Sequence, residues 1–78
     1  MFYVYVLRSK RDDDLYVGAT SNLKQRLEDH NTGAVESTRG RRPLELVYYE
    51  AGLERTKAFE REKYFETGFG RRFLSNRI

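Results

Sequence analysis

The first strand is the feature that most limits how this chain of 78 residues can fold. The run Phe2 to Arg8 consists largely of β-branched and aromatic residues, which favour an extended conformation. Alternation divides it into two apolar faces, with Tyr3, Tyr5 and Leu7 on one and Phe2, Val4 and Val6 on the other. Because both faces need cover, we expect this strand at the centre of a sheet.

The remaining turn and cap signals predict a small α/β domain. They divide the chain into a hairpin turn over 9–14, an antiparallel strand over 15–19, a helix over 22–30 capped by Ser21 or Thr20, an irregular basic loop over 34–43, a strand over 44–51 ended by Gly52, a helix over 54–67 and a helical turn over 73–76. On the third strand, alternation sets Leu44, Leu46 and Tyr48 opposite Glu45, Val47 and Tyr49. The order β-β-α-β-α-α predicts one domain over 1–78, a three-stranded sheet with helices packed on it.

Composition excludes several classes of site. The chain has no cysteine, which removes disulfides, thiolate metal sites and cysteine nucleophiles, and which fits a cytoplasmic protein in a reducing compartment. The N-terminal residues resemble a strand rather than a signal peptide, and no apolar run approaches the roughly 20 residues of a membrane helix. Asp12, Asp13 and Asp14 fit a solvated turn better than a metal cluster. We expect no membrane segment and no organic cofactor.

The charges are nearly balanced, with 15 basic and 12 acidic residues and a net charge of +3. Local clustering is more informative than the total. Two groups of arginines stand out, Arg39, Arg41 and Arg42 in one and Arg71, Arg72 and Arg77 in the other. The planar guanidinium suits phosphate because it donates two parallel hydrogen bonds. Each group is compatible either with binding to a nucleic-acid backbone or with a solvated surface.

Two polar side chains flank the apolar side of the first helix. At 100° per residue, Leu23 and Leu27 lie within ~40° of each other, His30 lies ~20° from Leu23, and Arg26 lies ~60° from it. Both polar residues therefore border the buried seam rather than the solvent side. The ordinary explanation is a histidine that closes the helix end and an arginine whose stem covers the core. The alternative is a functional pair one turn apart.

A glutamate in the second helix is also placed toward the core. Ala58, Phe65 and Phe69 are expected to mark the buried side of that helix, and Glu62 lies ~40° from Ala58. A carboxylate that faces a core is costly unless it is paired or binds a cation. Glu62 could pair with Arg26 or another inward arginine. It could instead hold Mg²⁺, which is often bound by one carboxylate together with substrate phosphate and waters.

Together these residue types suit the hydrolysis of a phosphodiester. A cation on Glu62 would polarise a phosphoryl oxygen, and Arg26 would neutralise charge in the transition state. A tyrosine, Tyr5 or Tyr16, would activate water only if its surroundings lowered a pKa that is ordinarily near 10. Arg26, His30 and the cation could supply such surroundings.

The order of these residues resembles the GIY-YIG nuclease family. The resemblance rests on Tyr3-Val4-Tyr5, then Tyr16-Val17-Gly18, then Asn22-Leu23-x-x-Arg26-x-x-x-His30, and finally Ala58-x-x-x-Glu62. The runs Arg39 to Leu44 and Arg61 to Lys63 are similar to those of small stand-alone members, single bacterial domains of the excinuclease-subunit-like type. The similarity extends over nearly the whole chain.

This resemblance implies an α/β sandwich around a central three-stranded antiparallel sheet. It also implies a DNA endonuclease, active in DNA repair or on branched nucleic acid, that uses one Mg²⁺ or Mn²⁺ ion held by Glu62. Tyr16 would be the general base, and Tyr5 would support it or share that role. Arg26 would contact the scissile phosphate, and His30 would position a tyrosine.

Several positions depart from the family pattern, among them Tyr3, which stands where the family name has glycine, and a late asparagine that has no secure counterpart. Ala19 follows the second motif where repair-type relatives carry lysine, and Glu66 stands where many small members carry lysine. A catalytically weak module that binds nucleic acid or a partner through the same face is therefore the alternative function. A plain scaffold, with inward polar groups that form a structural network, is the third.

Overall fold

The structure is a computed structural model that describes all residues from 1 to 78. Its elements in chain order are β1 (Phe2–Ser9), β2 (Leu15–Thr20), α1 (Leu23–Thr32), the 3₁₀ helix η1 (Glu36–Arg41), β3 (Leu44–Leu53), α2 (Arg55–Phe65) and α3 (Gly68–Ser75). None of the helices is long and apolar enough to cross a bilayer.

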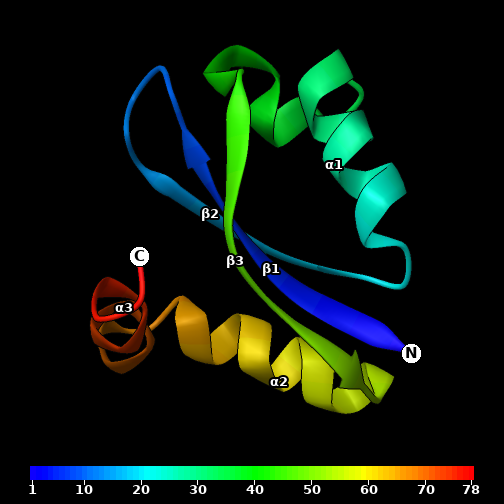
Figure 1. Cartoon of the computed structure of the whole chain (residues 1–78), viewed down its shortest axis with the longest axis vertical. Helices are drawn as coiled ribbons and strands as arrows, with labels where there is room; N and C mark the ends of the chain where they lie inside the picture. The colour runs from blue at the N-terminus through cyan, green and yellow to red at the C-terminus, as the bar shows by residue number, and fades with distance from the viewer.

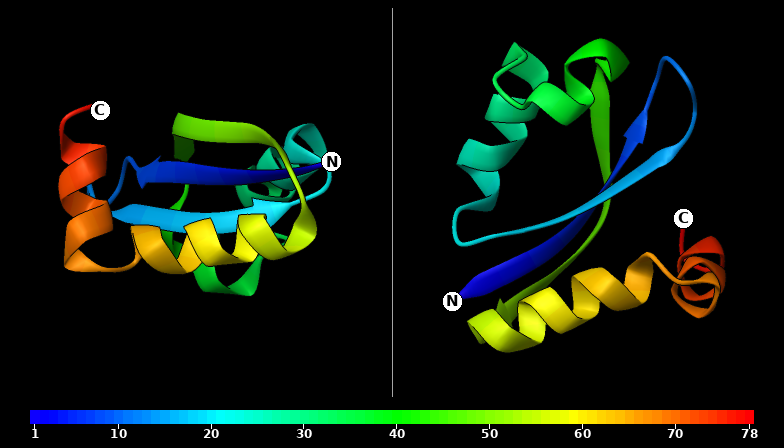
Figure 2. Two further views of the ribbon diagram at one scale, coloured as in Figure 1. Left: turned by 90° about the horizontal axis from the view of Figure 1, so that it is seen from below. Right: turned by 180° about the vertical axis from the view of Figure 1, so that it is seen from behind.

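The three strands form one antiparallel sheet in the order β2-β1-β3, which confirms the central position expected for the first strand. Figure 1 shows α1 and η1 on one side of this twisted sheet and α2 with α3 on the other. The views in Figure 2 give the same three layers from below and from behind. The predicted α/β sandwich is therefore the observed architecture.

Each face of the sheet has its own core. The cluster under α2 and α3 is formed by Val4, Val6, Val17, Ala58, Phe65 and Leu74. The smaller cluster under α1 is formed by Tyr5, Leu7 and Leu44, with Tyr16, Leu23, Leu27 and Leu46 packed against it. Strand β1 supplies both clusters through its alternating side chains, as its two apolar faces predict.

A bulge in β3 overturns the simple alternation expected there. Along β1 the register shifts between Val6, which pairs with Tyr48, and the next residue, which pairs with Leu46. Val47 and Tyr48 both pack on the cluster under α2 and α3, whereas Leu46 packs on the cluster under α1. The bulge adds one residue of β3 between these two pairs. It therefore moves Tyr48 to the opposite face from Leu46 and sets Tyr49 beside Tyr5.

The cap of α1 differs from the expectation of Ser21 or Thr20. The side chain of Asn22 accepts a hydrogen bond from the backbone N–H of Gln25, so Asn22 is the N-cap. Thr20 acts one step earlier, because its hydroxyl oxygen accepts from the N–H of Asn22. The helix ends at Gly33, whose φ of 88° is in the left-handed region that favours glycine.

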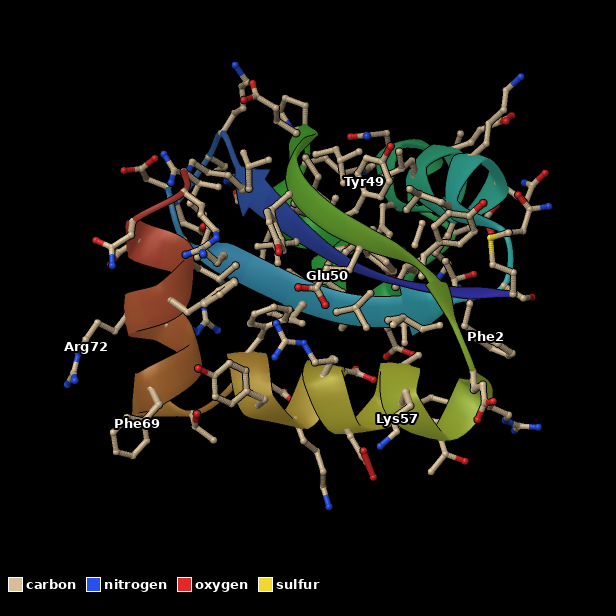
Figure 3. All side chains as sticks on the ribbon, turned by 60° about the horizontal axis from the view of Figure 1, so that its bottom comes forward. Phe2, Tyr49, Glu50, Lys57, Phe69 and Arg72 are labelled. Atoms are coloured by element: carbon tan, nitrogen blue, oxygen red, sulfur yellow. The ribbon has the colours of Figure 1, made fainter.

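Three other boundaries differ from the sequence expectations. The loop over 34–43 contains η1, and β3 continues past Gly52 to Leu53. The last helix begins at Gly68 instead of at 73, because the Thr67 hydroxyl caps it by accepting from the N–H of Gly70. The helical turn expected over 73–76 is its last turn. Phe69 belongs to α3 and is 71% exposed, so its expected burial was wrong; Figure 3 shows it projecting away from the domain.

Candidate active site

Strands β1 and β2 bring the two tyrosines together on the face under α1. Tyr5 pairs with Gly18, and Tyr16 pairs with Leu7, so both phenol rings lie on that face. The tip of the Tyr5 ring lies directly over Gly18. A Cβ atom at Gly18 would come within 2.4 Å of the Tyr5 hydroxyl oxygen. Glycine is therefore required there for the Tyr5 hydroxyl to reach across β2.

Helix α1 positions Arg26 and His30 one turn apart beside these rings. His30 is fully buried, and its ring packs edge-on at 5.1 Å between centroids from Tyr16 and 5.7 Å from Tyr5. Arg26 is half-buried, and its charge acts on Tyr5, Tyr16 and His30. These four residues, proposed from sequence as catalytic, lie together.

A chain of hydrogen bonds runs from the centre of the site into the protein. The Tyr5 hydroxyl lies 2.9 Å from Nε2 of His30, and the Thr38 hydroxyl lies 2.7 Å from Nδ1 of the same ring. Thr38 belongs to η1 and is fully buried. Sequence reasoning missed this residue. A threonine eight positions after the histidine, inside an expected loop, carries no periodic signal that would reveal it.

Burial sets the ionisation of this chain. It lowers the pKa of His30 to about 4, with the positive charge of Arg26 as the second cause. It raises the pKa of Tyr5 to about 12, although the adjacent guanidinium of Arg26 acts in the opposite direction. Both side chains are therefore neutral at pH 7. Arg26 in turn has its pKa raised by Tyr5.

Glu62 approaches from the other layer. It lies on α2, which packs against β1 and β2, and it is one turn after the buried Ala58. Its side chain makes no ion pair and no hydrogen bond, so of the two alternatives for Glu62 the pairing with Arg26 or another arginine is contradicted. Its negative charge nevertheless raises the pKa of Tyr5, which places the two side chains within electrostatic range of each other.

The unpaired carboxylate of Glu62 has the chemistry of a cation ligand. Burial, and second the charge of Glu66, raise the pKa of Glu62, so a cation there would relieve both penalties. Glu62 and Glu66 help to line an open hollow of about 570 Å³ along α2. No group of three acidic or histidine side chains gathers anywhere in the protein. A metal would thus be held by one or two carboxylates and complete its ligands from water and substrate.

The two arginine groups lie far apart. Figure 1 places η1 next to α1 at one end and α3 at the opposite end of the molecule. Around η1 the arginines are partly engaged: Arg41 pairs with Asp12 at 2.7 Å, and Arg39 donates to the carbonyl of Gly33 at 2.8 Å. Arg42 donates to the carbonyl of Arg39 at 2.8 Å. Asp12 is thus occupied by an ion pair, as a solvated turn allows.

The second group of arginines lies on α3 and just after it. Arg72 lies over the exposed ring of Phe69 at 5.7 Å and is drawn projecting into solvent in Figure 3. Arg71 is half-buried, and Arg77 stacks on Phe73 at 3.6 Å. The arginines therefore form two separate basic surfaces rather than one continuous patch.

Comparison with known proteins finds one family over most of the chain. Residues 1–73 match the family described as the GIY-YIG catalytic domain. A UPF0213 protein of Clostridium perfringens is 45% identical over 67 residues, which are 85% of this chain and 71% of that protein. A UPF0213 protein of Natronomonas pharaonis is 44% identical over 61 residues, 77% of this chain and 71% of that protein. The solution NMR structure of a UPF0213 protein from Bacillus halodurans superposes with a TM-score of 0.59 at 30% identity, covering 97% of this chain and 84% of that one.

Proposed function

The chain belongs to the GIY-YIG catalytic domain family, and from that premise we propose that it is a metal-dependent endonuclease that hydrolyses phosphodiester bonds in DNA. The observation that carries this proposal is the gathering of Tyr5, Tyr16, Arg26 and His30 on one face of the sheet. Charged and hydroxyl groups concentrated at a buried ring are costly for a scaffold and useful for phosphoryl chemistry.

Each residue has a distinct role in this proposal. Arg26 contacts the scissile phosphate and offsets the charge that develops on its oxygens in the transition state. Tyr16 is the general base toward the attacking water, since it is only half-buried and its ring lies beside the same histidine. Tyr5 supports it as a neutral group, because a pKa of about 12 keeps its hydroxyl protonated. His30 positions both rings.

Glu62 would hold one Mg²⁺ or Mn²⁺ ion. The fit rests on a half-buried carboxylate whose oxygens have no partner in the protein. When bound, such an ion polarises a phosphoryl oxygen and stabilises the leaving oxygen. The protein's own part is to keep the Glu62 carboxylate free, and Arg61 next to it is engaged by Glu50 at 2.8 Å.

The arginines would supply the contacts to the DNA backbone. Arg39, Arg41 and Arg42 at η1, and Arg71 and Arg72 on α3, are the proposed nucleic-acid-binding residues. Contacts to phosphate position a duplex without reading its bases, so we expect low sequence specificity. The two separate basic surfaces would then engage different segments of one DNA molecule.

Cleavage assays test this function. The purified protein is incubated with plasmid, single-stranded and branched DNA, in Mg²⁺ or Mn²⁺ and in chelator. We expect cleavage that chelator abolishes and that Tyr16→Phe and Glu62→Gln both lower by about 100-fold or more. Matched controls are Tyr64→Phe, whose hydroxyl makes no hydrogen bond, and Glu54→Gln, an exposed glutamate just before α2 whose side chain makes no cap hydrogen bond.

Two results would contradict the proposal. If no substrate is cut while DNA binds with a steep salt dependence, the chain is a nucleic-acid-binding module. If DNA is neither cut nor bound, the polar face is a structural network.

A further inference from the structure

Three buried polar side chains form a linear chain of hydrogen bonds at the site. Thr38 and His30 are fully buried and Tyr5 is 1% exposed. The chain contains two hydrogen bonds, one on each side of the imidazole ring. The Thr38 hydroxyl makes no other hydrogen bond, so its only polar partner is His30. Its direction of donation therefore decides which ring nitrogen carries the hydrogen.

Counting hydrogens fixes that direction. Thr38, a neutral His30 and Tyr5 carry one hydrogen each, so two hydrogen bonds leave one hydrogen unused at one end. If the ring hydrogen is on Nδ1, the unused hydrogen belongs to Thr38, where the core offers no acceptor. If it is on Nε2, the unused hydrogen belongs to Tyr5 and faces the site. A buried unpaired donor is costly, which favours the second arrangement.

We propose that Thr38 is a positioning residue of this site: its hydroxyl donates to Nδ1 of His30, which fixes the ring hydrogen on Nε2, where it is donated to the Tyr5 oxygen. The neutral state of the ring agrees with the lowered pKa of His30. This inference rests on the proposed function for its catalytic meaning, although the tautomer itself does not depend on cleavage.

The two tyrosines therefore have different roles in the proposed reaction. The Tyr5 oxygen accepts from His30, and it also faces Arg26, which carries only donors. Its lone pairs are thus occupied, while its hydroxyl hydrogen is free to donate to a phosphoryl oxygen. Tyr5 is therefore a hydrogen-bond donor to the substrate and not a proton acceptor. Tyr16, which lies outside the hydrogen-bonded chain, is left as the base.

Nitrogen NMR of the ring tests the assignment directly. His30 is the only histidine in the chain, so its two ring ¹⁵N signals need no assignment strategy. We expect Nε2 to be protonated and Nδ1 to be bare in the protein as it stands and in Thr38→Ser. In Thr38→Val, which keeps the shape and removes the hydroxyl, we expect the ¹⁵N signal of the bare Nδ1 to shift, because that nitrogen loses its hydrogen bond while Nε2 keeps the hydrogen. A ring hydrogen on Nδ1 in the unaltered protein, or an unmoved Nδ1 signal in the valine variant, overturns the proposal.

Steady-state kinetics of the Thr38 variants provide a second test. We expect Thr38→Val to lower kcat about tenfold at unchanged KM, and Thr38→Ser to restore it to within about twofold. Equal kcat in the valine and unaltered proteins overturns the positioning role. If neither protein cuts DNA, the endonuclease assignment fails while the NMR result still decides the tautomer. If the valine variant fails to fold, the tautomer of the unaltered protein decides alone.

A second inference comes from a groove on the opposite flank of α1. The groove has a volume of about 460 Å³ and is bordered by Tyr3, Tyr49, Leu27, Leu46 and Lys24, with no acidic side chain in its lining. Lys24 lies ~160° around the helix from Arg26, so α1 separates the groove from the catalytic residues. Tyr49 is 52% exposed, and Figure 3 shows it on the side of β3 that faces α1.

The groove has the chemistry of a nucleobase site. The rings of Tyr3 and Tyr49 meet at 55° with centroids 6.4 Å apart, and about half of Tyr49 is exposed to solvent. Tyr49 pairs with Tyr5 across the sheet because of the bulge in β3, so the groove adjoins the catalytic strand. Flat aromatic faces stack on any base, and Lys24 offers one cation for the attached phosphate.

We infer that this groove binds an unpaired nucleobase, stacked on Tyr49 with its phosphate near Lys24. This names single-stranded or branched DNA as the substrate class and rests on the proposed function. A base inside an intact duplex is stacked on a neighbour on each side, so it has no free face to offer to Tyr49. The groove therefore distinguishes DNA with unpaired bases from plain duplex.

Binding in chelator separates this inference from cleavage. The probe is an oligonucleotide with 2-aminopurine in a single-stranded overhang, compared with a blunt duplex of the same sequence. We expect Tyr49→Leu to weaken binding of the overhang about tenfold and to abolish fluorescence quenching, while Tyr49→Phe retains both. Duplex binding should not change. Unchanged overhang affinity in Tyr49→Leu, or an equal loss on both probes, overturns the inference even if the protein is an active endonuclease.

Discussion

The two faces of the sheet use the same strand for opposite purposes. Under α2 and α3, β1 contributes Val4 and Val6 to an apolar cluster that includes Phe65 and Leu74, all of them 0% exposed. Under α1, at the same depth, lie Tyr5, His30 and Thr38. One face is buried hydrocarbon, and the other is a buried polar chain. The two faces therefore differ in what they bury, hydrocarbon on one and hydrogen-bonded polar groups on the other.

The polar face is tolerated because its buried side-chain groups are paired. Both ring nitrogens of His30 are hydrogen-bonded, and the hydroxyls of Tyr5 and Thr38 are their partners. The apolar face is reinforced at its rim, where Arg61 pairs with Glu50 at 2.8 Å and stacks 4.6 Å from the Phe65 ring. We therefore expect substitutions on the α2 and α3 face to cost stability, and those on the α1 face to cost activity first.

The largest expected effect is loss of the Phe65 ring. Phe65 is fully buried and meets the rings of Tyr48, Tyr64 and Phe73. Phe65→Ala should lower the free energy of unfolding by about 3–5 kcal/mol, which is much of the stability of a domain this small. Urea unfolding followed by circular dichroism measures it. Any residual activity should fall only in proportion to the folded fraction.

Matched variants define this effect. Phe69→Ala removes the same ring from a position that is 71% exposed and should change stability by less than about 0.5 kcal/mol. Phe65→Leu, a milder change, keeps the domain folded if the alanine variant is unfolded. A loss below about 1 kcal/mol in Phe65→Ala would remove the distinction between the two faces.

The next effect is on the α1 face and reverses the pattern. Gly18→Ala would place a methyl group within 2.4 Å of the Tyr5 hydroxyl and force the ring out of its position over β2. We expect kcat to fall about 100-fold, while the free energy of unfolding falls by only ~1–3 kcal/mol. Gly40→Ala is the matched control, because nothing lies near its Cβ position. Full activity in Gly18→Ala would show that Tyr5 is not needed where it lies.

Much of the fold follows from local patterns in the sequence. The two-sided strand Phe2–Ser9, its antiparallel neighbour and the two principal helices all form where residue periodicity predicts, although Asn22 caps α1 in place of Ser21 or Thr20. The bulge beyond Leu46 was not predictable, because it depends on which neighbour each β3 residue meets across β1. The early start of α3 also depends on contacts between elements. Two glycines argue against a helix in the sequence, but Gly70 is buried at a point where a Cβ atom would contact the Tyr64 carbonyl, so glycine is needed there.

The candidate site divides in the same way. Helical angles alone put Arg26 and His30 beside the core, and the structure brings them to Tyr5 and Tyr16. They say nothing of Thr38, because a residue in a loop has no period that could point it inward. The freedom of Glu62 was likewise not predictable, since it depends on Arg61 being occupied by Glu50 from the sheet.

A smaller effect is the response of stability to acid, and it belongs to the α1 face alone. The pKa of His30 falls from its usual value of 6.5 to about 4 in the folded protein, so the folded state favours the neutral ring. Its contribution is complete above pH 6.5 and is lost as the pH falls toward 4. Between pH 7.5 and 5 we expect the free energy of unfolding to drop by roughly 2 kcal/mol. Urea midpoints across that range measure it.

The single histidine makes a clean control possible. His30→Gln keeps a polar side chain of similar length but does not titrate, so its stability should be lower at pH 7.5 and nearly constant down to pH 5.5. Carboxylates begin to contribute below that pH. An unaltered protein with the same flat profile would mean that the buried ring is not held neutral.

The smallest effects are expected at the two basic surfaces, which lie at opposite ends of the molecule. Arg39 at η1 lies next to α1 and uses only Nε in the protein, so its terminal nitrogens are free for phosphate. Arg72 on α3 lies at the other end. Each change to glutamine should weaken DNA binding by less than about tenfold and lower the slope of log K against log salt by about one. Because η1 also carries Thr38, the Arg39 contact lies nearer the site and should affect cleavage as well as binding.

Salt titrations of both variants measure the slopes, with Lys57→Gln on the outer side of α2 as the control. If only Arg72→Gln changes the slope, DNA approaches from the α3 end and the contacts proposed for η1 are wrong.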